Sequence, residues 1–167
     1  MIIPKNFNKN KKEYFRISKT FGNLSEFNQL QILRGIRENN VLLRITVFGK
    51  SMVPSIRNND VIILTPLKEK KLEIGDIVAF ESQLTKKPVI HRIINENNGN
   101  LLMKGDNCLY TDGEISIDRV LGLVSDIKRN GRSANFGISR VKVVLAWLSR
   151  MGILQKIVRD LNFDRKD

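Results

Sequence analysis

The sequence predicts a mainly β protein with a helix on either side of the β core, and three observations support this. Short segments rich in β-branched residues recur through the middle of the chain. Turn sequences built on Gly, Asn and Asp separate these segments. Apolar residues before and after them follow the helical period instead. The predicted strands are Val41–Val47, Val61–Leu64, Ile77–Phe80, Val89–Ile94, Leu101–Lys104 and Val120–Ile127.

Two turn sequences indicate how some of these strands connect. Residues 97–100 read Asn-Asn-Gly-Asn, and Asn and Gly favour the left-handed backbone of a tight hairpin. Asn130-Gly131 predicts a second such turn. We therefore expect antiparallel neighbours at both places.

The predicted N-terminal helix covers residues 26–38. Ser25 is a typical N-cap, because its hydroxyl can accept from a backbone N–H of the first turn. Phe27, Leu30, Leu33 and Ile36 then recur on one face. Residues 1–22 show little periodicity and are expected to form a loop or a short helix.

The C-terminal segment predicts one amphipathic helix over residues 138–161. An apolar stripe that includes Trp147 favours packing on the core. Basic residues line another side, so contact with a membrane surface or a protein partner stays open. The apolar stripe comprises Val144, Trp147, Leu148, Met151, Leu154, Val158 and Leu161.

The chain has 167 residues, enough for one domain with a core. We divide it into an N-terminal helical extension (1–40), a β domain (41–128) and a basic C-terminal tail (129–167). The net charge of +12 lies outside the middle: residues 51–127 carry nine Lys/Arg and eleven Asp/Glu, whereas the flanks carry ten and three each. No zinc-finger spacing, aromatic RNA-binding motif or long basic run accompanies this charge, so a nucleic-acid partner is not predicted.

Targeting and redox signals are also lacking in the sequence. The first twelve residues have no apolar region typical of a signal peptide, and no window holds the roughly 18 apolar residues of a spanning helix. Cys108 is the one cysteine, which excludes an internal disulfide, and it lacks an evident paired base. We predict a cytoplasmic protein, with peripheral membrane attachment open, and no cofactor or metal.

Residues 48–56 carry the first candidate for chemistry. A strand ends in Gly49, a serine follows at position 51, and Pro54 restarts the chain. This arrangement exposes the Ser51 hydroxyl beside backbone N–H groups, which suits acyl transfer. A serine that only stabilises a turn is the alternative interpretation.

His91 is the only histidine and lies within a predicted strand, where Arg92 points to the opposite face. Histidine is the side chain best suited to accept a proton from serine near neutral pH. Asp106 and Asp112 follow in turns, and either carboxylate is a candidate to orient the imidazole.

Taken in order, these motifs resemble the type I signal peptidase superfamily, which includes the LexA-type autoproteases. The resemblance covers about residues 41–128. It rests on Gly49-x-Ser51-Met52-x-Pro54, Asn59-Asp60, Gly75-Asp76-Ile77-Val78, Val89-Ile90-His91-Arg92-Ile93, Lys104-Gly105-Asp106-Asn107 with Asp112, and Val120-Leu121-Gly122.

The resemblance implies a coiled β-sheet core and a serine endopeptidase that binds its substrate as an extended strand. His91 occupies a position where many relatives carry lysine and the endoplasmic-reticulum and archaeal branch carries histidine. By the same resemblance Ser51 is the nucleophile, His91 the general base and Asp112 the orienting acid. Asp106 is implied as a supporting residue of the site. Removal of a leader from a ribosomally made precursor peptide is the expected task.

Four departures from the family pattern stand out. The largest is the membrane anchor of signal peptidases, which the sequence does not predict here, so we expect a soluble member of the superfamily. Lys50 beside the nucleophile is also unusual. Gly49 takes the place of a serine whose hydroxyl donates to the oxyanion in signal peptidases. Asn59 replaces a glycine, which Asn tolerates because it enters the left-handed region.

Two alternatives stay open at this point. A DNA-binding repressor with an autoprotease-like domain would explain the basic flanks, although residues 1–40 predict only one helix. A non-catalytic peptide-binding module on the same fold is the other.

Overall fold

The structure is a computed structural model that describes residues 14–17, 24–68 and 71–161. Among them, nine strands form one sheet in which β1, β2, β3, β8, β4, β5, β6 and β7 are successive neighbours and β9 pairs with β8. The strands are β1 (Tyr14–Ile17), β2 (Leu42–Thr46), β3 (Val61–Thr65), β4 (Ile77–Glu81), β5 (Pro88–Asn97), β6 (Asn100–Lys104), β7 (Gly113–Ser116), β8 (Val120–Arg129) and β9 (Arg132–Ser133). The helices are α1 (Glu26–Asn39), α2 (Lys142–Arg150) and α3 (Ile153–Asp160), with short 3₁₀ turns η1 (Ile117–Arg119) and η2 (Asn135–Ile138).

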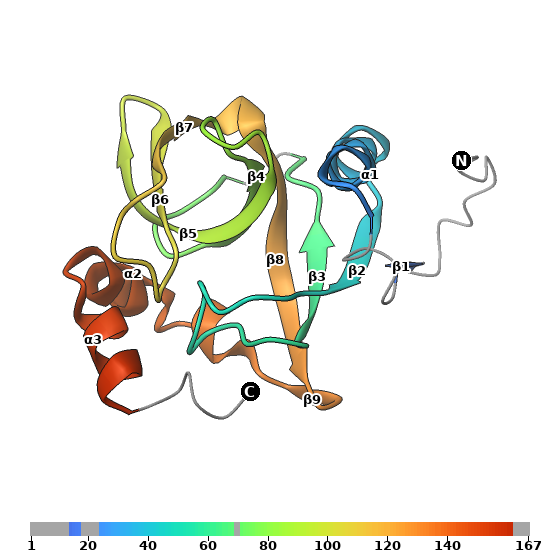
Figure 1. The fold of residues 1–167 in the computed structure, drawn as a ribbon. Coiled ribbons are helices and arrows are strands. Elements are labelled where there is room, and N and C mark those ends of the chain that lie inside the picture. The colour runs from blue at the N-terminus through green and yellow to red at the C-terminus, as the bar shows by residue number, and fades with distance from the viewer. Residues whose placement is uncertain (1–13, 18–23, 69–70, 162–167) are drawn as a thin grey trace.

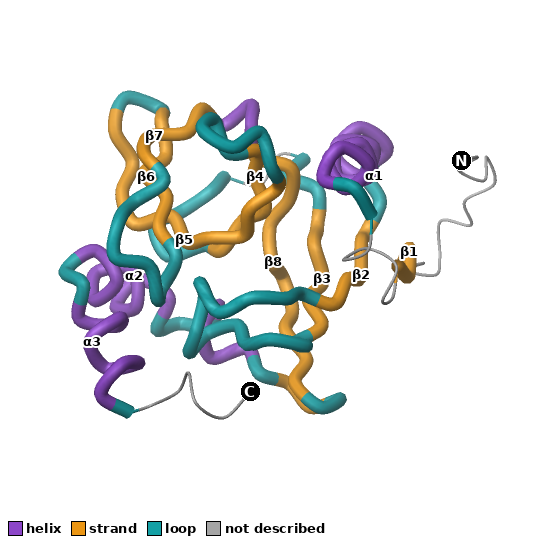
Figure 2. Tube along the Cα trace, viewed as in Figure 1, coloured by secondary structure: helices purple, strands orange, loops and turns teal. Residues whose placement is uncertain are grey.

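The sheet is strongly curled, and the long strand β8 runs down its middle (Figure 1). Strands β4 to β7 coil on one side of β8, whereas β3, β2 and β1 lie on the other. Helix α1 stands beside β2 and β3, and the α2–α3 pair lies at the opposite end of the molecule (Figure 2). The prediction of a mainly β, coiled sheet with flanking helices is confirmed.

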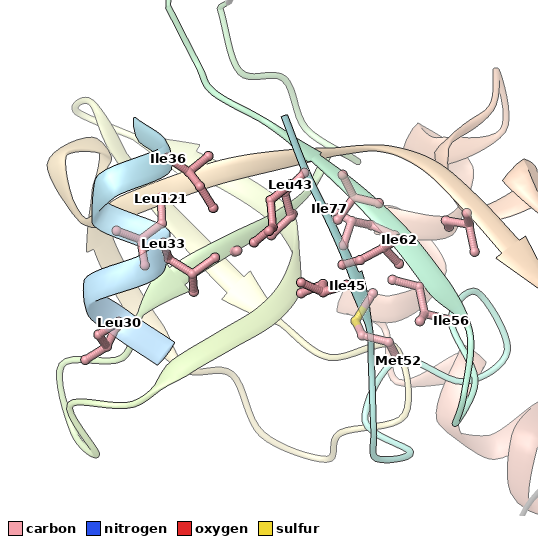
Figure 3. Packing of buried hydrophobic residues seen from close by; sticks show 14 residues of the cluster. Leu30, Leu33, Ile36, Leu43, Ile45, Met52, Ile56, Ile62, Ile77 and Leu121 are labelled. Carbon is pink, nitrogen blue, oxygen red and sulfur yellow. The ribbon is translucent and has the colours of Figure 1, made fainter. Parts of the chain in front are cut away.

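Two apolar clusters fill the interior, and β8 contributes to both. Leu121 and Val124 belong to the first cluster, whereas Val120 and Leu123 belong to the second. Helix α1 adds Leu30, Leu33 and Ile36 to the first cluster, as Figure 3 shows. These three residues of the predicted apolar face pack on the core, whereas Phe27, which was predicted for the same face, is 67% exposed.

The local predictions for the strands and turns are largely confirmed. Ser25 caps α1 by accepting from the Asn28 N–H. Asn98 and Gly99 have positive φ and join β5 to β6, and Asn130 and Gly131 do the same between β8 and β9.

Three expectations for the elements were wrong or incomplete. Residues 1–22 were expected as loop or short helix, but Tyr14–Ile17 form β1, which pairs in parallel with β2; the rest of that range lies outside the described residues. Strand β7 was not predicted. The single helix over 138–161 is two helices, because Gly152 adopts a left-handed backbone (φ +72°) between α2 and α3.

The expected core packing of the Trp147 stripe is also wrong for α2. Leu145, Ala146 and Ser149 face the body of the protein, whereas the Trp147 side is exposed. In α3, by contrast, the predicted Leu154 and Val158 are buried.

No helix within the described residues has the length and apolar character to cross a membrane. Those residues also bring no group of three or more His, Cys, Asp or Glu side chains together as a metal site.

Candidate active site

The chain leaves β2 through a turn that presents Ser51 at the surface. Gly49 has φ +111°, a backbone conformation that other residues rarely adopt, so glycine is required at this turn. Ser51 is exposed, whereas Met52 and Val53 immediately after it are buried and anchor the turn to the core. The sequence motif therefore forms the exposed serine turn that was predicted.

A second loop, after β6, lies directly against the serine turn. The Asn107 backbone N–H donates to the Ser51 carbonyl oxygen (2.8 Å), and its side-chain Nδ2 donates to the Lys50 carbonyl oxygen (3.2 Å). These two hydrogen bonds fix the position of the Ser51 backbone relative to the Gly105–Asp112 loop.

His91 reaches this region from β5 and is 7% exposed. Its Nδ1 lies 2.6 Å from Oδ2 of Asp112, the carboxylate that sequence analysis paired with it. Burial lowers the pKa of His91, but hydrogen bonds with Asp112 and Cys108, together with their charges, outweigh burial and raise the pKa from 6.5 to about 9. Because Asp112 occupies Nδ1, the hydrogen bond with Cys108 falls to Nε2, the nitrogen that a reaction at Ser51 would use.

The Nε2 side of His91 faces the loop that touches Ser51. A Cβ atom built on Gly105 would lie 2.9 Å from His91 Nε2, 2.7 Å from the Ser51 carbonyl oxygen and 2.6 Å from Cys108 Sγ. The three groups thus converge around Gly105, and any larger residue there would press on both the base and the serine turn.

Asp106 is placed in a neighbouring buried cluster and not against His91. Arg92, fully buried on the opposite face of β5, binds both Asp106 oxygens through Nε (2.7 Å) and Nη2 (2.6 Å). Ser55 donates to Asp106 (2.6 Å), and Arg92 also donates to the Gly75 and Gly137 carbonyl oxygens (2.8 Å each). We call Arg92, Asp106 and Ser55 the buried polar cluster; it joins β5 to the loops that hold Ser51 and Asp112.

An apolar cavity of about 620 Å³ opens beside Ser51 and His91. One wall continues from β2 through Thr46–Gly49, another is the Pro88–His91 part of β5, and α1 contributes Leu33. Met52, Ile56, Leu64 and Ala79 belong to the first apolar cluster and also line it. The cavity is suited to an extended, apolar peptide segment.

A match to a known protein family agrees with this arrangement of side chains. A family model described as Peptidase S24-like matches residues 4–125. The chain belongs to the Peptidase S24-like family. Membership of this peptidase family confirms the predicted resemblance and the predicted class of enzyme, a serine peptidase of the signal-peptidase type.

Individual relatives of this S24-like chain are catalytic subunits of signal peptidase complexes. SEC11 of Candida tropicalis is 34% identical over 72 residues, covering 41% of this chain and 43% of that protein. SEC11 of Scheffersomyces stipitis is 29% identical over 94 residues (50% and 56%). Human SEC11C is 34% identical over 81 residues, 42% of each protein. The chain thus spans about half the length of the curated relatives it matches.

Sequence reasoning missed two residues of this S24-like site. Arg92 was assigned only to the opposite face of the strand, and its complete burial requires a carboxylate partner that no local pattern reveals. Cys108 lacked an evident base in the sequence, yet the fold places its Sγ beside the His91 ring. The one signal in the sequence that could have placed Cys108 at the site is its position four residues before Asp112.

Proposed function

We propose that this protein is a serine endopeptidase in which Ser51 is the nucleophile, His91 the general base and Asp112 the residue that orients His91. The observation that carries the proposal is the 2.6 Å contact between His91 Nδ1 and Asp112, with Nε2 turned toward the serine turn. Neutral imidazole held in this way has its proton on Nδ1 and a lone pair on Nε2, the nitrogen that lies beside Cys108 Sγ.

The proposed reaction proceeds through an acyl-enzyme. Ser51 Oγ forms a bond to the scissile carbonyl carbon while its proton passes to His91 Nε2. His91 then gives this proton to the leaving amine as the C–N bond breaks. A water molecule, deprotonated by the same nitrogen, attacks the ester. The ester C–O bond then breaks, His91 returns the proton to Ser51 Oγ, and the peptide leaves as a carboxylate.

The Ser51 backbone N–H is the proposed oxyanion donor. It is at the exposed turn and meets no hydrogen-bond acceptor within the described ranges, whereas the Gly49 N–H donates to Asn58 Oδ1 (3.2 Å). Because Gly49 has no hydroxyl, the site lacks a side-chain donor there, an interaction worth about 3 kcal/mol of transition-state stabilisation in other serine peptidases.

The proposed substrate is an extended peptide with apolar residues beside the scissile bond. The cavity offers backbone along Thr46–Gly49 and Pro88–His91, and an added strand can bind such edges. Phe48, Leu109 and Tyr110, all exposed, flank the serine turn and the Asp112 loop. A leader segment of a ribosomally made precursor peptide has this character, and its removal is the task we propose.

A fluorophosphonate probe tests the nucleophile without knowledge of the substrate. The wild-type protein is expected to react at Ser51, because the probe phosphonylates only an activated serine, with loss of fluoride. Ser51→Ala should abolish labelling and lower peptide cleavage by roughly a millionfold. Ser133→Ala, at an exposed serine of β9, is the matched control and should react like the wild type.

The second half of the test uses a synthetic peptide that carries an extended, apolar leader segment. Cleavage by the wild type and not by Ser51→Ala, followed by mass spectrometry, supports leader removal. Undiminished labelling or cleavage by Ser51→Ala would contradict the assignment of the nucleophile.

A further inference from the structure

The exposed face of α2 is apolar, although a surface helix of a soluble domain usually directs charged residues outward. Val143, Val144, Trp147 and Met151 are between 54% and 61% exposed. Their spacing of three or four residues places them on one side of the helix, opposite the buried Leu145, Ala146 and Ser149. We call these four residues the α2 apolar face.

Basic residues border this face at both ends of the helix. Arg140 precedes it by one turn and Arg150 lies between Trp147 and Met151, and both arginines are exposed. No Asp or Glu occurs between Ile127 and Arg159. Lys142, on the other side, is held by ion pairs to Glu73 and Asp76 (2.7 Å each), so it stabilises the helix on the body and not the exposed face.

We propose that the α2 apolar face docks on an anionic lipid surface, with α2 lying in the plane of the headgroups. An exposed tryptophan beside aliphatic side chains suits the boundary between headgroups and acyl chains. The two arginines and the absence of carboxylates complement negatively charged lipids. This charge pattern favours a lipid surface over a second copy of the chain, because two such faces would bring four arginines together.

The docking would hold the proposed active site close to the bilayer. Lys104, one residue before Gly105, donates from Nζ to the Ser149 carbonyl oxygen of α2 (2.6 Å). The Gly137 carbonyl oxygen, just before α2, accepts from Arg92 of the buried polar cluster. These two hydrogen bonds connect the docked helix to the loops of the proposed active site, so docking would bring peptides at the membrane surface within reach of Ser51.

Trp147 is the only tryptophan, so its fluorescence reports on this face directly. Full-length protein is mixed with phosphatidylcholine vesicles that contain or lack phosphatidylglycerol. We expect a shift of the emission to shorter wavelength with the anionic vesicles, and weakening of this shift by added salt. Arg140→Gln and Arg150→Gln should each weaken binding roughly fivefold.

Met151→Asp keeps the tryptophan and places a carboxylate in the α2 apolar face, so it should abolish binding. Leu84→Asp is the matched control, since Leu84 is 84% exposed in the loop between β4 and β5. Circular dichroism verifies that both variants are folded. The proposal is overturned if neither vesicle shifts the emission, if Met151→Asp binds like the wild type, or if the shift depends on protein concentration without lipid, which would indicate self-association.

Discussion

The environment of His91 determines both the protonation of its imidazole and the orientation of the ring. A buried imidazole ordinarily loses its proton more easily, yet Asp112 at 2.6 Å, with Cys108 beside the ring, reverses this and raises the pKa to about 9. At neutral pH the resting imidazole is therefore largely protonated. A general base must be neutral, so the active fraction grows as the pH rises toward 9.

We predict that kcat/KM increases with pH through about 9 and that the His91 resonances titrate over the same range. Because His91 is the sole histidine, its ring signals in NMR spectra are assigned without ambiguity. Asp112→Asn removes the largest pKa-raising interaction and leaves burial, which lowers the pKa, so the titration should move to lower pH. Its activity at high pH should fall on the order of 10⁴-fold, because the tautomer is no longer fixed.

Glu114→Gln provides the control for the charge change, since Glu114 lies in β7, two residues beyond Asp112, and its side chain is exposed. It should leave the His91 titration near its wild-type position. A His91 titration that is unmoved in Asp112→Asn would contradict the role given to Asp112.

At the level of single residues, the sequence supports some of these assignments and not others. Ser51 and His91 carry recognisable chemistry where they stand, and the resemblance adds Asp112. In the sequence, Asp106 is an ordinary turn aspartate. Only the fold reveals that Arg92 and Ser55 donate hydrogen bonds to its carboxylate oxygens. Such partners lie 14 and 51 positions away, beyond any local pattern.

Among the elements, the buried polar cluster ties strand β5 to three loops. Arg92 of β5 binds Asp106 after β6 and Ser55 after the serine turn, and it also reaches the carbonyl oxygen of Gly137 in η2. A buried guanidinium without its carboxylate would be an uncompensated charge. The cluster is therefore a positioning device for the loops that present Ser51 and Asp112.

We predict that Asp106→Asn destabilises the protein by roughly 3–5 kcal/mol, because it removes the charge that compensates Arg92. Unfolding in urea, followed by circular dichroism, measures this loss. Asp118→Asn is the matched control: the Asp118 side chain is 85% exposed and pairs with Arg37 at 3.8 Å, so its loss should cost at most about 1 kcal/mol. Equal losses in the two variants would mean that the buried pair contributes no more than a surface one.

Strands, turns and helices differ in how well the sequence predicts them. The strands with local alternation and the hairpin turns with Asn-Gly were found, since both signals lie within a few residues. Strand β1 was missed because its partner β2 lies 28 positions further along the chain, with α1 between them. The break at Gly152 was overlooked because the apolar period of the tail continues across it.

For the whole molecule, strand β8 decides whether the two apolar clusters unfold together. Its neighbouring residues alternate between the clusters, and it pairs with β3 on one side and β4 on the other. The predicted separation into an N-terminal extension (1–40) and a β domain (41–128) stays a prediction. The packing of Leu30, Leu33 and Ile36 of α1 in the first cluster nevertheless favours a single cooperative unit.

We predict that Leu43→Ala in the first cluster and Met103→Ala in the second each lower the free energy of unfolding by roughly 2–5 kcal/mol and shift one common transition. Both side chains are fully buried, so each truncation leaves a cavity that only partly closes. Far-UV circular dichroism reports mainly on the sheet, and emission of Trp147 reports on α2. The two signals should coincide in wild type and in both variants, with Leu84→Ala, at an exposed position, as the unshifted control. If Met103→Ala instead unfolds in two separate steps, the clusters are independent and β8 does not couple them.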